Sequence, residues 1–235
     1  MTPDHARTEI ERLRAMYVEC DASADYGRQF RPFDPREFGY RSQQLRCLAE
    51  MLREAGRHDL SGMRILDFGC GTGRLLGDLI GLGAEPALLC GVDLSKERLD
   101  AAARRHPHVR FQLASGSSIG FGDASFDLVI QAVVFSSIGL ADLRRRLADE
   151  MLRVLAPGGF VYWWDLFRVL PQAGGQRLDP RELFLGCGFR GRRVSWLPRP
   201  SEGIARRRWK WALGAVVDLF AARPTHLAAL IGPKT

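Results

Sequence analysis

Apolar residues near the start of the chain recur at the spacing of amphipathic helices. Over residues 5–20, Ile10, Leu13 and Tyr17 fall on one side of a predicted helix. The same periodicity predicts a second amphipathic helix over residues 36–55, which ends before a glycine. The chain therefore begins with two helices, before any strand is predicted.

From residue 64 onward, short apolar runs alternate with amphipathic stretches. The predicted strands cover residues 64–68, 88–92, 109–113, 126–134, 160–167, 189–197 and 226–231. The predicted helices between them cover residues 73–82, 96–105, 141–155, 179–185 and 202–222. This alternation predicts a doubly wound α/β fold with a mostly parallel, seven-stranded sheet. We divide the chain into an N-terminal helical cap, residues 1–60, and a main domain, residues 61–235.

The first predicted strand runs directly into a glycine-rich turn. Asp67 stands near the end of this strand, and Gly69, Gly71 and Gly73 alternate with other residues behind it. Glycine adopts the positive φ values that such a bend needs and lets a ligand approach bare backbone. In open α/β sheets, ligands bind at the carboxyl ends of the strands, where this turn lies.

The turn does not match the two common phosphate-binding patterns. The dinucleotide fingerprint G-x-G-x-x-G places a third glycine where this chain has Arg74. A P-loop requires Gly-Lys-Ser or Gly-Lys-Thr, which is absent. The pattern therefore favours a ligand without a pyrophosphate, and a glycine turn that holds no ligand is the alternative.

Other loops at the same predicted edge carry polar groups. Asp93 ends the second strand, where its carboxylate can accept both hydroxyls of a ribose. The loop Ser115–Ser117 follows the third strand and can offer backbone N–H groups to an adenine edge. Gln131, near the end of the fourth strand, is expected close to the centre of the site.

Four segments together resemble the motifs of class I S-adenosylmethionine-dependent methyltransferases. They are Ile-Leu-Asp-Phe-Gly-Cys-Gly-Thr-Gly at 65–73, Gly-Val-Asp-Leu-Ser at 91–95, Ser-Phe-Asp-Leu-Val at 125–129 and Met-Leu-Arg-Val-Leu-Ala-Pro-Gly-Gly at 151–159. They occur in the order of the family and cover about 65–160. The resemblance implies a Rossmann-like methyltransferase fold and S-adenosyl-L-methionine as cofactor.

The resemblance also implies roles for individual residues. Asp67 and Gly69 would hold the methionine amino group, while Gly71 and Gly73 line the cofactor. Asp93 would bind the ribose. The remaining implied contacts are Leu94 packing on adenine, the backbone of Gln131 at the methionine end, and the backbone of Gly116 and Ser117 at adenine. Many relatives carry an acidic residue where Ser115 stands, so here the Ser115 hydroxyl or the backbone of Gly116 and Ser117 must serve the adenine amino group.

A looser resemblance links the N-terminal segment and residues 131–138 to a bacterial subgroup of small-molecule methyltransferases. Such enzymes are often associated with secondary-metabolite or polysaccharide pathways. Tyr26 lies in an aromatic-rich loop of this N-terminal segment and is expected to close over the cofactor. Packing of the cap on the edge of the sheet is the alternative role for this loop.

Methyl transfer to an alcohol benefits from a base that removes the proton of the acceptor. Asp165, at the end of the fifth strand, is the first candidate, with a salt bridge or a helix cap as its alternative role. His226, which opens the last strand, is the second candidate, with a structural role as the alternative. No group of His, Asp and Glu has metal-ligand spacing, so we expect no catalytic metal.

Composition and charge limit the kinds of molecule that we expect this protein to bind. The net charge of +7 comes mainly from scattered arginines, which are typical of solvated faces rather than a nucleic-acid track. The five cysteines show no C-x-x-C pairing, and no signal peptide or membrane span is evident, so a cytoplasmic protein is expected. The predicted helix 202–222 is basic and contains tryptophan, and we expect it to contact a membrane surface, the substrate pocket or another subunit. The protein is expected to be either a monomer or a homodimer.

These features predict methyl transfer to a small molecule, at an oxygen of a sugar or natural-product scaffold. RNA methylation is one alternative, which the basic charge permits. The other is a protein of the same fold that binds the cofactor without transferring a methyl group, as a cyclase or regulatory partner.

Overall fold

The computed structural model describes residues 3–22, 35–114, 118–166, 177–194 and 226–233. Its centre is a seven-stranded sheet with the strand order β3-β2-β1-β4-β5-β7-β6. The strands are β1 Ile65–Phe68, β2 Leu89–Asp93, β3 Arg110–Leu113, β4 Phe126–Ala132, β5 Leu155–Leu166, β6 Gly188–Val194 and β7 His226–Gly232. Among the described strands, β7 alone runs opposite to the others and pairs antiparallel with both β5 and β6, so the predicted doubly wound, mostly parallel sheet is confirmed.

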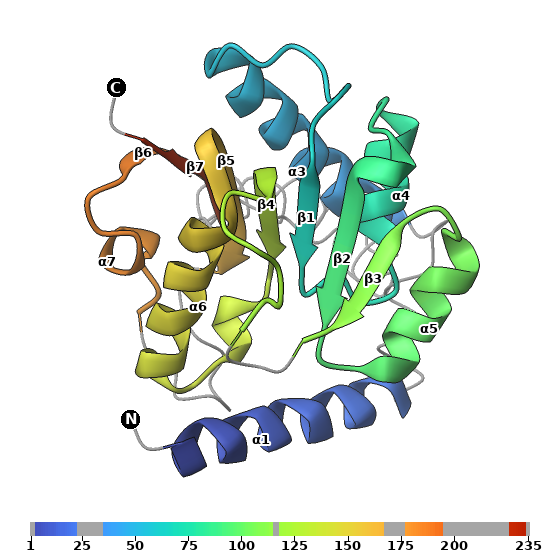
Figure 1. Ribbon diagram of the computed structural model, residues 1–235, viewed down its shortest axis with the longest axis vertical. Helices are drawn as coiled ribbons and strands as arrows, with labels where there is room; N and C mark the ends of the chain where they lie inside the picture. The colour runs from blue at the N-terminus through green and yellow to red at the C-terminus, as the bar shows by residue number, and fades with distance from the viewer. Residues whose placement is uncertain (1–2, 23–34, 115–117, 167–176, 195–225, 234–235) are drawn as a thin grey trace, which may run out of the picture.

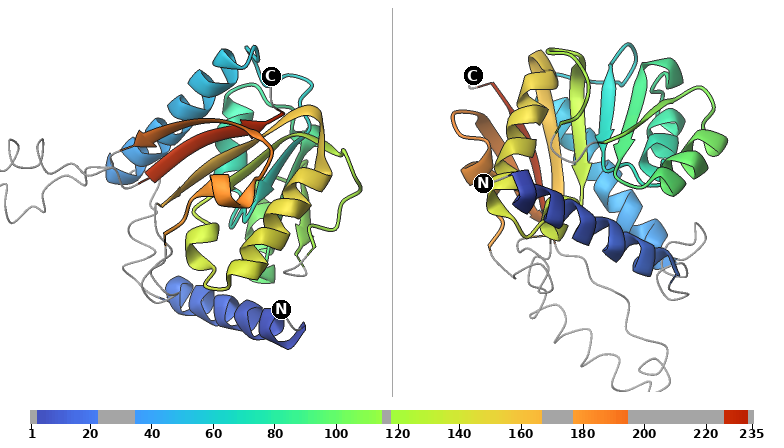
Figure 2. Two further views of the ribbon diagram at one scale, coloured as in Figure 1. Left: turned by 90° about the vertical axis from the view of Figure 1, so that its left-hand side faces the viewer. Right: turned by 60° about the horizontal axis from the view of Figure 1, so that its bottom comes forward.

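Helices cover both faces of the sheet (Figure 2). They are α1 Pro3–Ala22, α3 Pro35–Glu54, α4 Arg74–Gly81, α5 Lys96–Arg105, α6 Ala141–Val154 and α7 Pro180–Leu183, with short 3₁₀ turns η1 Pro86–Leu88 and η2 Phe135–Ser137. Apolar side chains of α3, α4 and α5 pack in one core cluster. Those of α1 and α6 pack in a second cluster on the other face, which also includes residues beside α7.

The sequences of the strands explain why the sheet lies in the interior of the protein, between two layers of helices. All four residues of β1 are buried, and β4 is buried at five of its seven positions. Parallel strands covered on both faces are expected to read as continuous apolar runs, which is the pattern seen here. Local caps fit the sequence as well, since the Ser95 side chain accepts a hydrogen bond from Arg98 N at 3.2 Å at the start of α5.

Within the described ranges, two predicted strand boundaries differ from the structure by two residues or more. β4 ends at Ala132 rather than at 134, because Val133 takes a positive φ of 57° and leaves the strand conformation. β5 begins at Leu155, five residues before the predicted start, because Leu155 already pairs with Phe126. Both differences arise from contacts between distant segments rather than from local preference.

The first two helices occupy different places. In Figure 1, β1, β2 and β4 point downward, and α1 lies across the edge at which these strands end. α3 instead packs into the core against the sheet. It is tied to α4 by two ion pairs, Glu37 with Arg74 and Arg41 with Asp78. α1 is therefore the element that approaches the carboxyl edge, and α3 forms part of the main body.

The helix predicted over 202–222 lies outside the described residues. None of the described helices is long and apolar enough to cross a membrane.

Candidate cofactor site at the carboxyl edge of the sheet

The glycine turn after β1 is held against β2 and lies close to the segment that follows β4. The amides of Gly69 and Cys70 both donate to the carbonyl of Val92, at 2.8 and 3.0 Å. Gly69 has a φ of +77°, and a Cβ added there would lie 2.4 Å from Cγ2 of Val134. Glycine is required at this position, because both the backbone angle and the close approach exclude a side chain.

Gly71 lies next in the turn and faces open space. Its φ is +54°, and a Cβ added there would meet no atom within 4 Å. Its amide donates to Oδ2 of Asp93 at 2.9 Å, while the amide of Ser95 donates to Oδ1 at 2.9 Å. Each carboxylate oxygen keeps a second lone pair. Asp93 thus fixes the turn and can still accept hydroxyl groups from a ligand.

Asp67 has a different environment from Asp93. Its side chain is 2% exposed, and no described residue donates a hydrogen bond to its carboxylate. Burial, with the nearby charge of Asp93, raises its pKa to about 7. A buried carboxylate without donors is best compensated by a cation. This position therefore suits a ligand with an ammonium group.

Gln131 pairs with Phe68 in the register of β1 and β4, and it therefore lies at the carboxyl edge of the sheet, next to the glycine turn. It is fully buried, and its Oε1 accepts from the amide of Val134 at 3.3 Å. Its Nε2 has no hydrogen-bond partner among the described residues. Unpaired buried donors are rare in native proteins, so this amide is available to a ligand or a water molecule.

Sequence reasoning missed the strained residue that follows. Val133 is β-branched and has a φ of 57°, a conformation that is an outlier for such a side chain. Its amide donates to the carbonyl of Trp164 at 2.8 Å, which holds it in place. Strained residues of this kind gather at functional sites. No local pattern marks Val133, because the strain depends on the neighbouring strand.

A pocket opens beside the glycine turn. Its lining includes three predicted site residues, Gly69, Asp93 and Leu94. The rest of the lining is mainly apolar and comes from Ile10, Leu13, Tyr17, Phe68, Val92, Ala114, Ser118, Val134, Ile138, Leu143 and Leu147. The apolar stripe of α1 was visible in the sequence, but its place over this pocket was not.

Polar contacts fasten α1 at both sides of the pocket. Toward its start, Arg12 Nη2 donates to the carbonyl of Ser137 at 2.6 Å, and the amide of Gly139 donates to Glu9 at 2.6 Å. Toward its end, the guanidinium of Arg98 lies 4.4 Å from the ring centre of Tyr17. Arg98 also pairs with the nearby Asp21 at 2.7 Å. α1 is thus bound to the loop after β4 and to α5.

Asp165 is fully buried at the end of β5, on the face of the sheet that carries α6. Its Oδ2 accepts from the amides of Phe135 and Ser136 at 2.9 and 3.3 Å, and its Oδ1 accepts from the amide of Leu166 at 2.8 Å. Burial raises its pKa to about 6, although these three backbone donors oppose the shift. In this structure Asp165 anchors the η2 turn.

His226 lies on the opposite face, at the start of β7. Its ring stacks on Trp164 with the centroids 5.5 Å apart, and its Nε2 is 3.5 Å from the hydroxyl of Tyr40. Burial lowers its pKa to about 4, so the imidazole is neutral at neutral pH. The structure therefore does not bring the two predicted catalytic residues, Asp165 and His226, onto one face.

Other predicted residues divide into two groups. Gly73 has a φ of 73° and is the N-cap of α4, as the turn required. Tyr26, Gly116 and Ser117 lie outside the described residues.

Within the described ranges, no group of three or more His, Cys, Asp or Glu side chains could hold a metal ion.

Comparison with known proteins finds a family model that is similar to the segment carrying the glycine turn and Asp93. Residues 65–159 match the family model described as a methyltransferase domain. Phthiotriol/phenolphthiotriol dimycocerosates methyltransferase 1 of Mycobacterium ulcerans is 35% identical over 116 residues, 48% of this chain and 41% of that protein. The O-methyltransferase cnsE of Penicillium expansum is 36% identical over 111 residues, 45% of this chain and 38% of that protein. The chain thus matches less than half the length of these two curated relatives.

Solved structures share the fold. The N-methyltransferase NodS from Bradyrhizobium japonicum, in complex with S-adenosyl-L-homocysteine, superimposes with a TM-score of 0.66 at 18% identity, over 94% of this chain and 98% of NodS. The fold and the edge site define a Rossmann-like α/β protein. The matched segment specifies it further: residues 65–159 are similar to a methyltransferase domain, and the solved neighbour with the same fold is an N-methyltransferase.

The residues at the carboxyl edge fit S-adenosyl-L-methionine, the cofactor of this family. The unpaired Asp67 carboxylate suits a cationic amino group. The open space at Gly71 permits close approach to backbone, and Asp93 can accept ribose hydroxyls. The half-buried Leu94 lies in an apolar pocket of the kind that accommodates an aromatic base.

Proposed function

We propose that this protein transfers a methyl group from S-adenosyl-L-methionine to an oxygen of a small molecule. The observation that carries the proposal is the edge site, in which Asp67, Asp93 and the open Gly71 lie beside an apolar pocket covered by α1. A helix across the pocket suits a small acceptor better than a long polymer. Relatives named as O-methyltransferases support oxygen as the target.

We assign the cofactor contacts as follows. Asp67 holds the amino group, Asp93 accepts the ribose hydroxyls, and Leu94 packs on the adenine. The turn at Gly69 and Gly71 brings backbone close to the methionine portion. When bound, the cofactor supplies a methyl group on a positively charged sulfur. The chain orients this group and keeps water out, because the pocket is lined mainly by apolar side chains.

We propose Asp165 as the group that takes the acceptor proton, with His226 as the competing candidate. Asp165 lies on the pocket's face of the sheet, and its raised pKa of about 6 leaves it ionised at neutral pH. Both of its oxygens also hold backbone amides, so it positions the η2 turn as well. His226 is a neutral imidazole and has the protonation state that a base needs.

The test is a reaction of the protein with S-adenosyl-L-methionine and a panel of small alcohols, phenols, amines and RNA, followed by mass spectrometry of the products. We expect S-adenosyl-L-homocysteine together with a methyl ether. Methylation of an amine or of RNA alone contradicts oxygen transfer to a small molecule. Binding of S-adenosyl-L-homocysteine without transfer to the panel or to a co-purified acceptor supports a protein that only binds the cofactor.

Asp165→Asn and His226→Gln separate the two candidate bases. If Asp165 is the base, its variant loses roughly 10²–10⁴-fold in kcat and the rise of the rate through about pH 6 disappears. A kcat loss with an unchanged pH profile would assign Asp165 to positioning alone. Full kcat in Asp165→Asn together with a large loss in His226→Gln would move the role to His226.

A further inference from the structure

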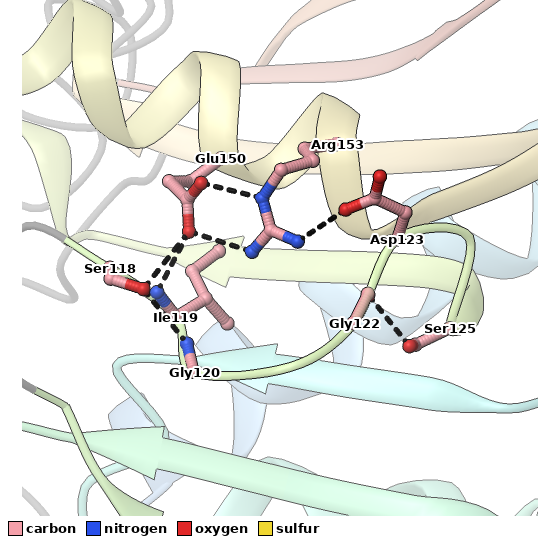
Figure 3. Close-up of polar contacts among 8 residues, drawn as sticks. All are labelled: Ser118, Ile119, Gly120, Gly122, Asp123, Ser125, Glu150 and Arg153. Atoms are coloured by element: carbon pink, nitrogen blue, oxygen red, sulfur yellow. Dashed lines mark hydrogen bonds and ion pairs between the residues drawn. The ribbon is translucent and has the colours of Figure 1, made fainter.

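A charged pair on α6 reaches the loop that follows β3 (Figure 3). Glu150 Oε2 accepts from the amide of Ile119 at 3.1 Å and from the hydroxyl of Ser118 at 3.3 Å. The Ser118 hydroxyl in turn accepts from the amide of Gly120 at 3.2 Å. One carboxylate oxygen therefore organises three consecutive residues of a loop that lies 30–32 positions earlier in the sequence.

Arg153, one turn further along α6, holds Glu150 in place. Its Nε donates to Oε1 of Glu150 at 2.6 Å, and its Nη2 donates to Oε2 at 2.9 Å. Its Nη1 donates to Asp123, further along the same loop, at 2.7 Å. Figure 3 shows the guanidinium between the two carboxylates. A bidentate pair of this kind fixes direction as well as distance.

The contacts keep Glu150 ionised. Arg153 and the donors of Ile119 and Ser118 lower the pKa of Glu150 to about 2, although partial burial opposes the shift. The carboxylate is therefore negative at any pH well above 2. It remains an acceptor for the loop and a partner for Arg153 under all these conditions.

This loop forms one wall of the cofactor pocket. Ser118 lines the pocket together with Asp93 and Leu94. Ile119, directly behind it, is fully buried and anchors the loop in the core. The position of the wall thus depends on where Glu150 holds Ser118 and the amide of Ile119.

We propose that Glu150 is a positioning residue for cofactor binding: through Ser118 and Ile119 it sets the wall of the pocket that receives the nucleoside. The proposal rests on the proposed use of this pocket for the cofactor. The ligand is a nucleoside thioether or sulfonium, and Glu150 acts on its affinity without touching it. Arg153 supports Glu150 in the same role.

The test compares Glu150→Gln with Asp149→Asn, by calorimetric binding of S-adenosyl-L-homocysteine and 5′-methylthioadenosine. Asp149 is an exposed carboxylate on the same helix, so its variant removes the same charge one residue away. We expect Glu150→Gln to raise both Kd values by about tenfold, or ~1.4 kcal/mol. Asp149→Asn should change neither by more than about twofold, the size of typical surface effects.

Equal losses for the two ligands locate the effect at the nucleoside, because 5′-methylthioadenosine lacks the amino-acid portion. A loss confined to S-adenosyl-L-homocysteine would overturn the proposal, as would wild-type affinity in Glu150→Gln or a similar loss in Asp149→Asn. If the wild-type protein binds neither ligand, the cofactor assignment itself fails, and that outcome is distinct from a failure of Glu150.

A second variant covers the case in which Glu150→Gln does not fold. Ser118→Ala removes one of the two groups that Glu150 holds and should raise both Kd values by about threefold, within the range of a single hydrogen bond. In a folded double variant the combined loss should be smaller than the sum of the two, because Ser118→Ala removes one of the two contacts through which Glu150 acts. Wild-type affinity in Ser118→Ala, or fully additive losses, would overturn the proposal.

Discussion

At the scale of single residues, the two acidic side chains of the site have opposite surroundings. Asp93 already accepts the amides of Gly71 and Ser95, so its carboxylate is stabilised before any ligand arrives. Asp67 accepts no donor from the described residues, and its pKa is raised to about 7 by burial and by Asp93. Asp93 therefore holds the glycine turn, whereas the carboxylate of Asp67 accepts no hydrogen bond from the described residues, which is why we propose it as the partner of the ligand's amino group.

This difference predicts a pH dependence of cofactor binding. Below pH 7, Asp67 in the ligand-free protein is protonated, and it must lose this proton to pair with an ammonium group. The affinity for S-adenosyl-L-homocysteine should fall as the pH drops from 8 to 6, by up to about tenfold per unit. Calorimetry in buffers of different ionisation enthalpy should detect the released proton. Asp67→Asn should bind more weakly and lose this dependence.

Asp67→Asn should weaken ligand binding, but it should stabilise the ligand-free protein. A carboxyl group whose folded pKa is raised stabilises the protein fully below its unfolded pKa, and that contribution is lost as the pH rises through the folded value near 7. Asp67→Asn without ligand should therefore melt at a higher temperature than the wild type at pH 8. An equal or lower Tm, or a pH slope of binding that persists in the variant, would contradict the assigned role.

Two glycines of the turn predict distinct defects. Gly69→Ala should destabilise the fold by several kcal/mol, because its Cβ would lie 2.4 Å from Val134 Cγ2. Gly71→Ala meets no protein atom within 4 Å, so its cost should be limited to the left-handed backbone, about 1–2 kcal/mol. Its methyl group should instead weaken S-adenosyl-L-homocysteine binding. Chemical denaturation and calorimetry measure the two effects, and similar stability losses in both variants would argue against this account.

At the scale of elements, α1 is distinctive because it lies outside the matched segment 65–159 and still lines the pocket. Its apolar residues face the pocket, while Glu9, Arg12 and Tyr17 connect it to the loop after β4 and to α5. We propose that α1 is the part of the N-terminal cap that closes over the cofactor. α3 contributes to the core on the other face of the sheet.

A pair of variants on α1 tests this role. Leu13 is 3% exposed and lines the pocket, whereas Val18 is 66% exposed on the same helix. Leu13→Ala removes buried contacts that are typically worth about 2–5 kcal/mol, which should loosen α1 and raise the Kd for S-adenosyl-L-homocysteine at least about threefold. Val18→Ala should bind as the wild type does. Stopped-flow measurement of ligand release checks the result, and unchanged release in Leu13→Ala would refute the proposed closure.

At the scale of the whole molecule, the pocket belongs to one of the two core layers. Its apolar lining comes from the cluster that contains α1 and α6. Asp165 lies on this side, and His226 lies on the other with Tyr40 and Trp164. A cofactor bound in this pocket would therefore join α1, the turn after β1 and α6, while the layer of α3 and α4 supports the sheet from behind.

Much of this arrangement could be predicted from residues that are close together in the chain. The strands, the helices and the turn at Gly69 to Gly73 follow from hydrophobic period and from backbone angles that only glycine adopts readily. The placement of Asp93 beside the turn follows from the parallel crossover, which brings the ends of β1 and β2 to one edge. The amino-acid sequence by itself therefore determined the fold class, the edge that carries the site and the family of the domain.

Only the tertiary structure decided which distant groups meet at that edge. α1 was predicted as an amphipathic helix, but no local pattern states what its apolar stripe covers. Glu150 meets Ser118, and Asp165 meets the amide of Phe135, across thirty or more residues of chain. The strain at Val133 and the raised pKa of Asp67 also come from neighbours that packing supplies. Such contacts depend on the way in which whole layers fit together, and sequence periodicity carries no information about that fit.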